Sequence, residues 1–246
     1  MKKISIIVLS VLFCIFFISP ELTAKKNSKK NNIKQQAVEE EAESGKKDKE
    51  QFKKKFRKYF IKNKSLSYKN SFLKVIEIET IDDKVECWYS GEKFEPENNS
   101  FTKTYNKSDY FNCEHVWPQS KFGKAKAAGA KHDMHHLIPT EQKMNTMRSS
   151  WPYGEATTRR DISDLKNNVF EVRDKFKGNI ARSIFYFSVM YNCPIEDNEE
   201  KVLREWNKID PADKFDKMRN DGIENAQGNR NIFSDHPEYV DLIEDF

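Results

Sequence analysis

A carboxylate beside an imidazole, followed along the chain by an amide and a guanidinium, is the pattern here with the clearest chemical meaning. Glu114 directly precedes His115, and Asn145 and Arg148 follow, three residues apart from each other. Hydrolysis of a phosphodiester needs a base that takes a proton from water, and positive charge that stabilises the phosphoryl group and the departing oxygen. The four residues together therefore predict metal-assisted phosphodiester hydrolysis.

Each of the four residues has an expected role. His115 is the expected general base, because the pKa of a neutral imidazole lies near working pH. Glu114 and Asn145 are the expected ligands of Mg²⁺, which prefers oxygen donors and keeps several waters. Arg148 lies one helical turn after Asn145 and is expected to grip a phosphate in a bidentate way. Taken singly, each residue more often has a structural role, and only their order and spacing favour the catalytic interpretation.

Three histidines, His132, His135 and His136, lie between the two halves of this pattern. A zinc site is the weaker interpretation, because the chain lacks an HExxH sequence and paired CxxC motifs. His135 and His136 are therefore expected to support the active site, with hydrogen-bonded core residues as the alternative.

Lysines gather in a Gly- and Ala-containing segment before these histidines. Cations on a flexible backbone can follow a phosphate chain without reading bases, but a solvated loop explains the same composition equally well. The formal net charge of +4 is too small to identify a polyanionic partner by itself. The segment contains Lys121, Lys124, Lys126 and Lys131, of which Lys121 and Lys124 are the predicted substrate contacts.

Local patterns predict the elements that position these residues. Residues 115–118 and 133–138 are expected to form two short strands. Pro139 should end the second strand, and Thr140 should cap a helix over residues 141–148. Strand, loop, strand and helix is the expected order.

The adjacency of Glu114 and His115 creates a geometric difficulty. Neighbouring residues of a regular strand point to opposite faces, so both serve one substrate only if the backbone is irregular or if the metal and the water approach from different sides. We therefore expect local distortion at residues 113–115.

The flanking regions predict a mixed fold. Upstream, residues 72–80 and 84–89 resemble a pair of strands, although residues 73–78 could equally end a helix. Apolar spacing downstream predicts helices over residues 179–191, 201–206 and 214–223, and polar loops over residues 227–231 and 235–237. The expected fold class is α+β, in a single domain.

The first part of the chain differs in composition from the rest. Residues 1–24 have a basic start, an apolar run and a small-residue cleavage site, as in a secretory signal peptide; a retained anchor is disfavoured because the run is shorter than the ~20 residues of a spanning helix. Residues 25–55 carry charge blocks of alternating sign and are expected to form a disordered linker. The folded domain is predicted over residues 56–246.

Four ordered motifs occupy residues 112–120, 133–140, 178–182, and 219–223 with 227–231. They resemble the endonuclease I family of secreted and periplasmic nucleases, over about residues 56–240. The resemblance implies a ββα-metal (His-Me finger) core packed with several helices. It also implies Mg²⁺-dependent, largely sequence-nonspecific cleavage of DNA and often RNA, with 5′-phosphate products.

By this resemblance His115 matches the general base and Glu114 and Asn145 the metal ligands. Arg148 matches a phosphate-contacting arginine, and Arg182 in the third motif is a further predicted substrate contact. Mn²⁺ or Ca²⁺ are alternatives to Mg²⁺, and no small-molecule cofactor is expected. The expected partners are DNA and RNA, with a membrane contacted only through an uncleaved signal peptide, and the expected state is a monomer.

The chain also departs from the family pattern. Cys113 stands where a basic or aromatic residue is common, and the cysteine complement of the disulfide-rich branch is absent. Cys87, Cys113 and Cys193 allow three single pairings, among which the sequence does not choose. The sequence thus predicts a secreted or periplasmic endonuclease, and the alternative is a secreted nucleic-acid-binding module without turnover.

Overall fold

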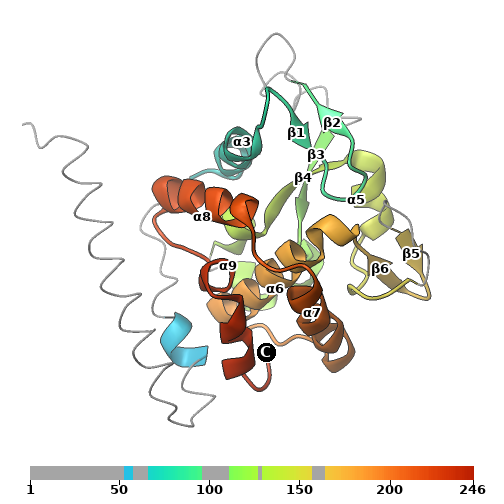
Figure 1. Ribbon diagram of the computed structural model, residues 1–246, viewed down its shortest axis with the longest axis vertical. Coiled ribbons are helices and arrows are strands. Elements are labelled where there is room, and N and C mark those ends of the chain that lie inside the picture. Colours follow the sequence, from blue (N-terminus) through green and yellow to red (C-terminus); the bar gives the residue numbers. More distant parts are fainter. Residues whose placement is uncertain (1–52, 58–65, 96–110, 127–128, 157–163) are drawn as a thin grey trace, which may run out of the picture. The chain divides into compact units, whose positions relative to one another are not determined.

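The computed structural model describes residues 53–57, 66–95, 111–126, 129–156 and 164–246 (Figure 1). The predicted signal peptide and nearly all of the predicted linker lie outside these ranges. In the first short helix Phe56 is fully buried, and its ring stacks on that of Tyr239 with centroids 5.8 Å apart. No helix in the described ranges has both the length and the apolar character that a membrane crossing requires.

Two strands and a helix form around the candidate residues, with bounds that differ from the prediction. β3 (Phe111–His115) pairs antiparallel with β4 (Leu137–Glu141), and α5 (Gln142–Arg148) follows β4 directly. The first strand therefore ends at His115 instead of beginning there. Thr140, the expected helix cap, lies within β4.

Residues 133–136 are not part of the second strand, contrary to the prediction. They include a 3-10 turn, η4 (Met134–His136), because the Asp133 side chain accepts a hydrogen bond from the His135 N–H at 3.1 Å and caps the turn. A local side-chain contact has here replaced the expected strand pairing.

Pro139 lies inside β4, where we expected the strand to end. The Val116 N–H donates to the His136 carbonyl at 2.9 Å, and antiparallel pairs alternate between hydrogen-bonded and non-hydrogen-bonded, so Cys113 and Pro139 form a non-hydrogen-bonded pair. The proline nitrogen therefore points away from β3, and its missing N–H costs no ladder bond.

Upstream, residues 72–80 belong mainly to a helix, so the predicted strand is wrong and the helical alternative holds. α3 (Tyr68–Glu79) buries Phe72, Val75 and Ile76. Spacings of three and four residues place these side chains on one helix face.

Two short hairpins complete the strands of the described residues. The strand predicted over residues 84–89 shortens to β1 (Val85–Glu86), which pairs with β2 (Lys93–Phe94). β5 (Asp164–Lys166) pairs with β6 (Val169–Glu171).

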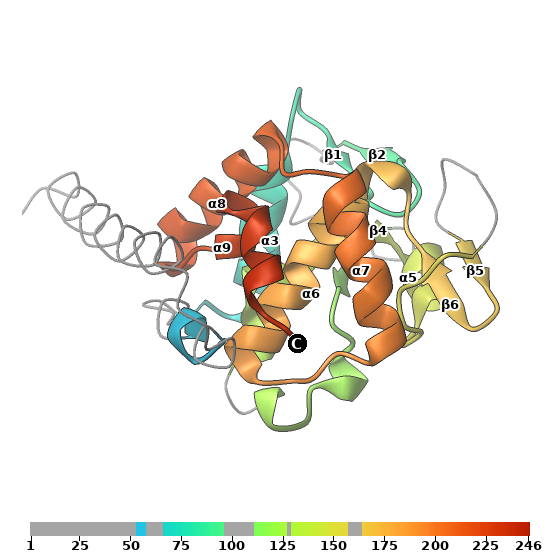
Figure 2. The same cartoon turned by 60° about the horizontal axis from the view of Figure 1, so that its bottom comes forward.

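The three helices predicted downstream are confirmed, and each is longer than predicted. They are α6 (Lys177–Tyr191), α7 (Asp197–Ile209) and α8 (Lys214–Gln227). Of the predicted loops, residues 228–231 lie outside helices and strands, as expected. Two short helical segments, α9 (Ile232–Asp235) and η6 (Pro237–Leu242), reach into the loop predicted over residues 235–237. α6 is buried along most of its length and packs against α7 and α9 (Figure 2).

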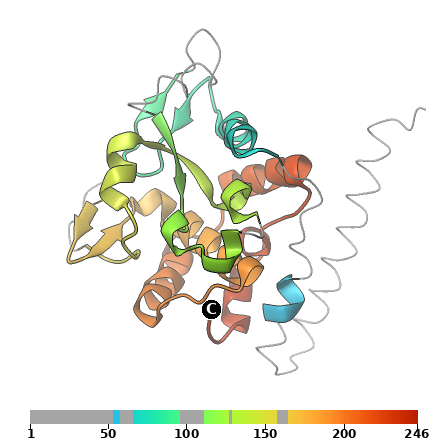
Figure 3. The ribbon, with the colours of Figure 1, turned by 180° about the vertical axis from the view of Figure 1, so that it is seen from behind.

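The strand pair β3–β4 is held between helices. α5 packs on one side of it and α3 on the other, with α8 against α3 (Figure 3). α8 and α6 both contact η4, so these two helices hold the turn that precedes β4. This arrangement confirms the predicted α+β class for the described residues.

Candidate active site

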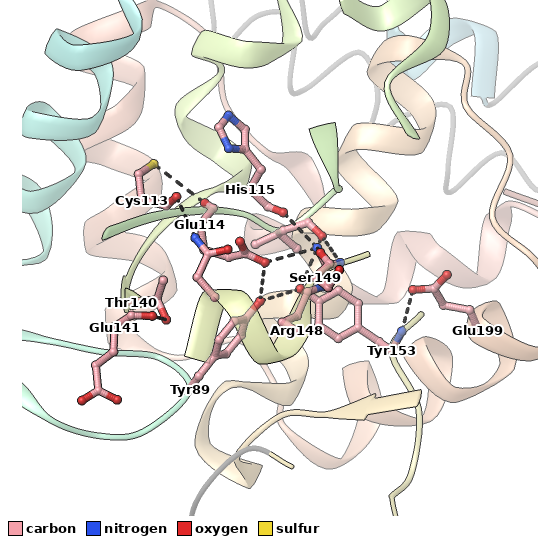
Figure 4. A network of polar contacts seen from close by, with 12 residues as sticks. Tyr89, Cys113, Glu114, His115, Thr140, Glu141, Arg148, Ser149, Tyr153 and Glu199 are labelled. Atoms are coloured by element: carbon pink, nitrogen blue, oxygen red, sulfur yellow. Dashed lines mark hydrogen bonds and ion pairs between the residues drawn. The ribbon is translucent and has the colours of Figure 1, made fainter. Parts of the chain in front are cut away.

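Glu114 is a buried carboxylate in a network of polar contacts (Figure 4). Its Oε1 accepts hydrogen bonds from Arg148 Nη1 and from the Tyr89 hydroxyl, each at 3.2 Å, and the Tyr89 and Tyr153 hydroxyls lie 2.8 Å apart. Burial raises the pKa of Glu114 to about 7, because the loss of hydration outweighs the attraction of Arg148. A cation nearby would favour the ionised carboxylate.

Arg148 is 1% exposed, and most of its guanidinium contacts are internal. Besides Glu114, Nη1 donates to the His115 carbonyl at 3.3 Å, and Nη2 donates to the Val116 carbonyl at 2.7 Å. Nε is buried and has no hydrogen-bond partner among the described residues. Arg148 is thus placed to hold Glu114 and the end of β3, and the predicted bidentate phosphate grip is not available while Nη1 and Nη2 are engaged.

His115 is buried on the other side of β3. Its Nε2 lies 3.2 Å from the Lys131 carbonyl, which can only accept, so Nε2 carries the proton and Nδ1 keeps a lone pair. The ring stacks on Tyr68 with centroids 5.4 Å apart and lies 5.3 Å from the His136 ring. Burial, aided by His136, lowers the pKa of His115 to about 3 and keeps the ring neutral.

The expected distortion at residues 113–115 is absent. All residues of β3 pair with β4 in one unbroken register. Glu114 consequently points towards Arg148, whereas the His115 ring points away from that network (Figure 4). An irregular backbone therefore does not explain how Glu114 and His115 could serve one substrate. The remaining explanation is that the metal and the water approach the substrate from different sides.

Asn145 is the second predicted metal ligand and lies half-buried on α5. Its Nδ2 donates to the Cys113 carbonyl at 3.2 Å, which fixes the amide and leaves Oδ1 as its acceptor atom. No group of three or more His, Cys, Asp or Glu side chains in the described part of the chain could hold a metal ion. The two predicted ligands, Glu114 and Asn145, offer oxygen atoms from two elements in contact, β3 and α5.

Comparison with known proteins identifies the family. The model of the Endonuclease I family matches residues 44–238. The chain belongs to the endonuclease I family.

Relatives of the chain bear the names of nucleases. The chain is 35% identical to the extracellular ribonuclease of Bacillus amyloliquefaciens, over 54% of this chain and 53% of that protein. It is 29% identical to endonuclease-1 of Buchnera aphidicola, over 53% and 62% of the two chains. It is 27% identical to a periplasmic deoxyribonuclease of Aeromonas hydrophila, over 59% and 73%. The chain spans a little over half the length of the ribonuclease relatives.

In this endonuclease I chain, His135 and His136 are fully buried. His136 Nε2 bonds to the Ala130 carbonyl at 2.7 Å, and His135 Nε2 bonds to the Asn229 carbonyl at 3.2 Å. Ala130 is the neighbour of Lys131, whose carbonyl contacts His115. The His136 ring lies 5.3 Å from that of His115, whereas His135 packs on Tyr186 with ring centroids 4.5 Å apart. The supporting role of both histidines stays a prediction.

Arg182 does not lie at the candidate site, so its predicted substrate contact needs correction. It is 1% exposed, donates to both carboxylate oxygens of Asp216 at 3.1 and 2.9 Å, and donates to the Asp210 carbonyl at 2.8 Å. These contacts join α6 to the start of α8. Arg182 is therefore part of the scaffold.

The motif residues of α8 also have structural contacts. Arg219 donates to the Met134 and Leu137 carbonyls at 2.8 and 2.7 Å, at the two ends of η4. Gln227 donates to Asp133 at 2.8 Å, and Asp133 is the residue that caps η4. The motif therefore holds the turn that leads into β4.

The sequence analysis missed Tyr89 and Tyr153, which complete the environment of Glu114. Tyr89 lies 25 residues before Glu114 and Tyr153 lies 37 residues after Val116, whose carbonyl it contacts. No spacing rule links residues so far apart along the chain. Their apolar ring character indicated only that they would be buried.

The predicted lysine contacts lie at the surface near the site. Lys121 on η1 (Gln119–Lys121) and Lys124 on η2 (Gly123–Lys126) are exposed and line a cavity of about 530 Å³. Lys131 holds His115 through its carbonyl, and its Nζ lies 5.0 Å above the Tyr68 ring. The side chain of Lys126 lies outside the described atoms.

All three cysteines of the predicted domain are unpaired. Cys87 and Cys113 are buried, and burial raises the pKa of the Cys113 thiol well above its usual value. A thiol that resists ionisation is a poor nucleophile, which agrees with an inert role for Cys113.

Proposed function

We propose that this chain is a secreted or periplasmic, metal-dependent endonuclease that hydrolyses phosphodiester bonds in DNA and RNA with little sequence preference and leaves 5′-phosphate ends. The observation that carries the proposal is the ββα unit of β3, β4 and α5, which carries a neutral imidazole on one face of β3 and a carboxylate on the other, with an amide on the adjoining helix. Family membership and the nuclease names of the relatives support the same reaction class.

His115 is the proposed general base. Because Nε2 donates to the Lys131 carbonyl, Nδ1 takes a proton from water as the water attacks phosphorus. The bond from phosphorus to the 3′-oxygen breaks, as 5′-phosphate products require, and the 3′-oxygen takes a proton from solvent. The negative charge of the phosphate favours the imidazolium and so raises the pKa of His115 from its low value in the free protein.

Glu114 and Asn145 are the proposed ligands of Mg²⁺, with Mn²⁺ or Ca²⁺ as alternatives. A carboxylate and an amide supply oxygen donors only, which fits a hard cation that keeps most of its water shell. Arg148 orients the Glu114 carboxylate, and the Cys113 carbonyl orients the amide of Asn145. When bound, the cation supplies positive charge to the phosphoryl group and the departing oxygen.

The sequence and the relatives support the proposed location and partners. Export is proposed from the signal peptide predicted over residues 1–24, and it agrees with relatives named extracellular and periplasmic. We propose a monomer that acts on DNA or RNA without an organic cofactor. Lys121 and Lys124 are exposed and are the proposed contacts to the nucleic-acid backbone.

The test is incubation of the protein with supercoiled plasmid and with a mixed-sequence RNA, in Mg²⁺ and in EDTA. We expect nicking and degradation that EDTA stops and that His115→Ala removes. His236→Ala is the matched control, because His236 contacts Glu238 near the C-terminus and lies outside the site. If the protein binds both nucleic acids but cleaves neither of them in Mg²⁺, Mn²⁺ or Ca²⁺, the alternative of a non-catalytic binding module would be supported.

A further inference from the structure

A cavity of about 530 Å³ lies beside the candidate active site. Its volume is within the range of about 300–1,000 Å³ that small-molecule sites occupy. The proposed reaction chemistry uses neither of the two tryptophans in its wall. The lining includes Trp117, Lys121, Lys124, Arg148 and Trp151.

Trp151 is the exposed member of this set. It is 38% exposed, whereas Trp88, Trp117 and Trp206, the other tryptophans of the chain, are at most 7% exposed. An exposed indole offers a flat face on which a base can stack. Trp117 is already stacked on Phe187, with ring centroids 4.7 Å apart.

The backbone after α5 holds Trp151 in a defined place. The Trp151 N–H donates to the Arg148 carbonyl at 3.1 Å, and between them Ser149 has a φ of 50° and a ψ of −115°. A non-glycine residue persists in this left-handed region only where its surroundings enforce it. The Ser149 carbonyl accepts from Arg148 Nη1 at 3.4 Å. The arginine that orients Glu114 thus also fixes the turn that carries Trp151.

The charges of the cavity fit a nucleotide better than a bare phosphate. Lys121 and Lys124 attract phosphate, but Glu196 and Glu199 also line the cavity and repel it. Glu199 accepts the Tyr153 N–H at 2.8 Å. A nucleotide combines an anionic phosphate with a base that carries polar donors, so it can satisfy charges of both signs.

We propose that this cavity is a nucleotide subsite, in which Trp151 stacks on an unpaired base of the substrate and Lys121 and Lys124 bind the adjoining phosphates. The subsite rests on the proposed nuclease function and adds a substrate preference to it. In a duplex each base is already stacked and paired, so a base can reach Trp151 only from a single strand or an opened end. The protein therefore binds single-stranded nucleic acid in preference to duplex.

The experiment measures binding without turnover. In EDTA, the intrinsic tryptophan fluorescence is titrated with a mixed-sequence single-stranded oligonucleotide and with the corresponding duplex. Because Trp151 is the exposed tryptophan of the cavity and Trp117 is 7% exposed, we expect the single strand to quench the wild type and to quench Trp151→Phe much less. Trp151→Ala removes the ring on which the base stacks, so the affinity for single strand should fall about five- to hundredfold. This affinity is measured by the fluorescence anisotropy of a labelled oligonucleotide. Duplex affinity should change little.

Matched controls separate the subsite from general effects. Ile209→Ala removes an apolar side chain that is 62% exposed on α7 and should not alter binding. Lys121→Gln with Lys124→Gln should lower single-strand affinity and reduce its salt dependence, whereas Lys217→Gln on α8 should do neither. Trp151→Phe keeps an aromatic face and should recover part of the affinity lost in Trp151→Ala.

The outcomes distinguish the subsite from the nuclease proposal. Equal weakening on single strand and duplex, or quenching retained in Trp151→Phe, would overturn the subsite even if the wild type cleaves nucleic acid. Quenching that depends on Trp151 in a protein that cleaves neither DNA nor RNA would support the subsite and overturn the proposed nuclease function.

Discussion

Replacing Arg148 by methionine should separate a role in positioning from a role in phosphate binding. Arg148 Nη1 and Glu114 Oε1 are 3.2 Å apart, and the two side chains are 1% and 5% exposed. Removing one partner of such a buried pair costs about 3–5 kcal/mol, because the other charge loses its compensation. Tyr89 still donates to Glu114, so at a pH that keeps Glu114 ionised we expect a loss of folding stability near the lower end of that range, about 3 kcal/mol.

Glu114 can avoid most of this cost by taking up a proton. Its pKa is already raised to about 7, and Arg148 acts against that rise. A loss of about 3 kcal/mol corresponds to roughly two pKa units, at about 1.36 kcal/mol each. In Arg148→Met the acid limb of kcat/KM should therefore move to higher pH by about one to two units. Additional Mg²⁺ should restore part of the rate, because it binds only the ionised carboxylate.

The assay is plasmid cleavage across neutral and alkaline pH at several Mg²⁺ concentrations, with denaturant unfolding of the same variant. Arg148→Lys is the matched control, because it keeps the positive charge but loses the second donor group. It should destabilise the protein with a smaller shift of the pH profile. If Arg148→Met instead left the profile in place and raised KM with a reduced dependence on salt, Arg148 would be a phosphate ligand and the reasoning from its burial would be refuted.

Four further predictions concern the base, the metal, the carboxyl group and the substrate. His115→Ala should fold normally and lower kcat on the order of a hundredfold or more, because it removes the general base; near-normal single-turnover rates would exclude His115 from that role. Glu114→Ala and Asn145→Ala should each raise the Mg²⁺ concentration for half-maximal rate, since each removes an oxygen ligand. An unchanged midpoint in both variants would place the ion elsewhere. In the absence of metal, Glu114 should make stability fall as pH rises from 4.5 to about 7, because the folded protein keeps a proton that the unfolded chain has lost. Urea unfolding of Glu114→Gln should lack this contribution to the slope, and parallel slopes for both proteins would contradict it. Cleavage sites on a mixed-sequence duplex should be scattered, and the rate should fall steeply with monovalent salt at fixed Mg²⁺, because phosphate contacts release counterions; one recurrent cut sequence would contradict phosphate-based binding.

The order of strand, strand and helix was predictable from the sequence, but the strand bounds were not. Apolar spacing and residue type are local properties, and they sufficed for α6, α7 and α8. The bounds of β3 and β4 depend on contacts between distant segments. Asp133 bends the chain into η4 through its own side chain, and Pro139 is accepted in β4 because its partner, Cys113, requires no hydrogen bond from it.

The positions of Glu114, His115 and Asn145 on a strand and a following helix could be predicted, because their order along the chain determines where they lie in a ββα unit. Their roles as base and metal ligands stay predictions. The roles of the arginines could not be predicted. Arg148 is neutralised by Glu114, 34 residues away, and Arg182 is neutralised by Asp216, also 34 residues away. A sequence shows that a guanidinium group is present, but only the tertiary structure shows whether that group is already paired with a carboxylate.

Burial acts in opposite directions on the adjacent residues Glu114 and His115. It raises the pKa of the carboxyl group to about 7 and lowers the pKa of the imidazole to about 3, because in both cases it disfavours the charged form. The alternation of β3 sends the two side chains to separate environments, so neither can neutralise the other. In the proposed mechanism a cation favours ionised Glu114 on one face, and the phosphate favours protonated His115 on the other. Metal binding is thus coupled to proton release from Glu114. His115 is still neutral when the substrate binds, and the phosphate stabilises the imidazolium that forms when the ring takes a proton from the attacking water.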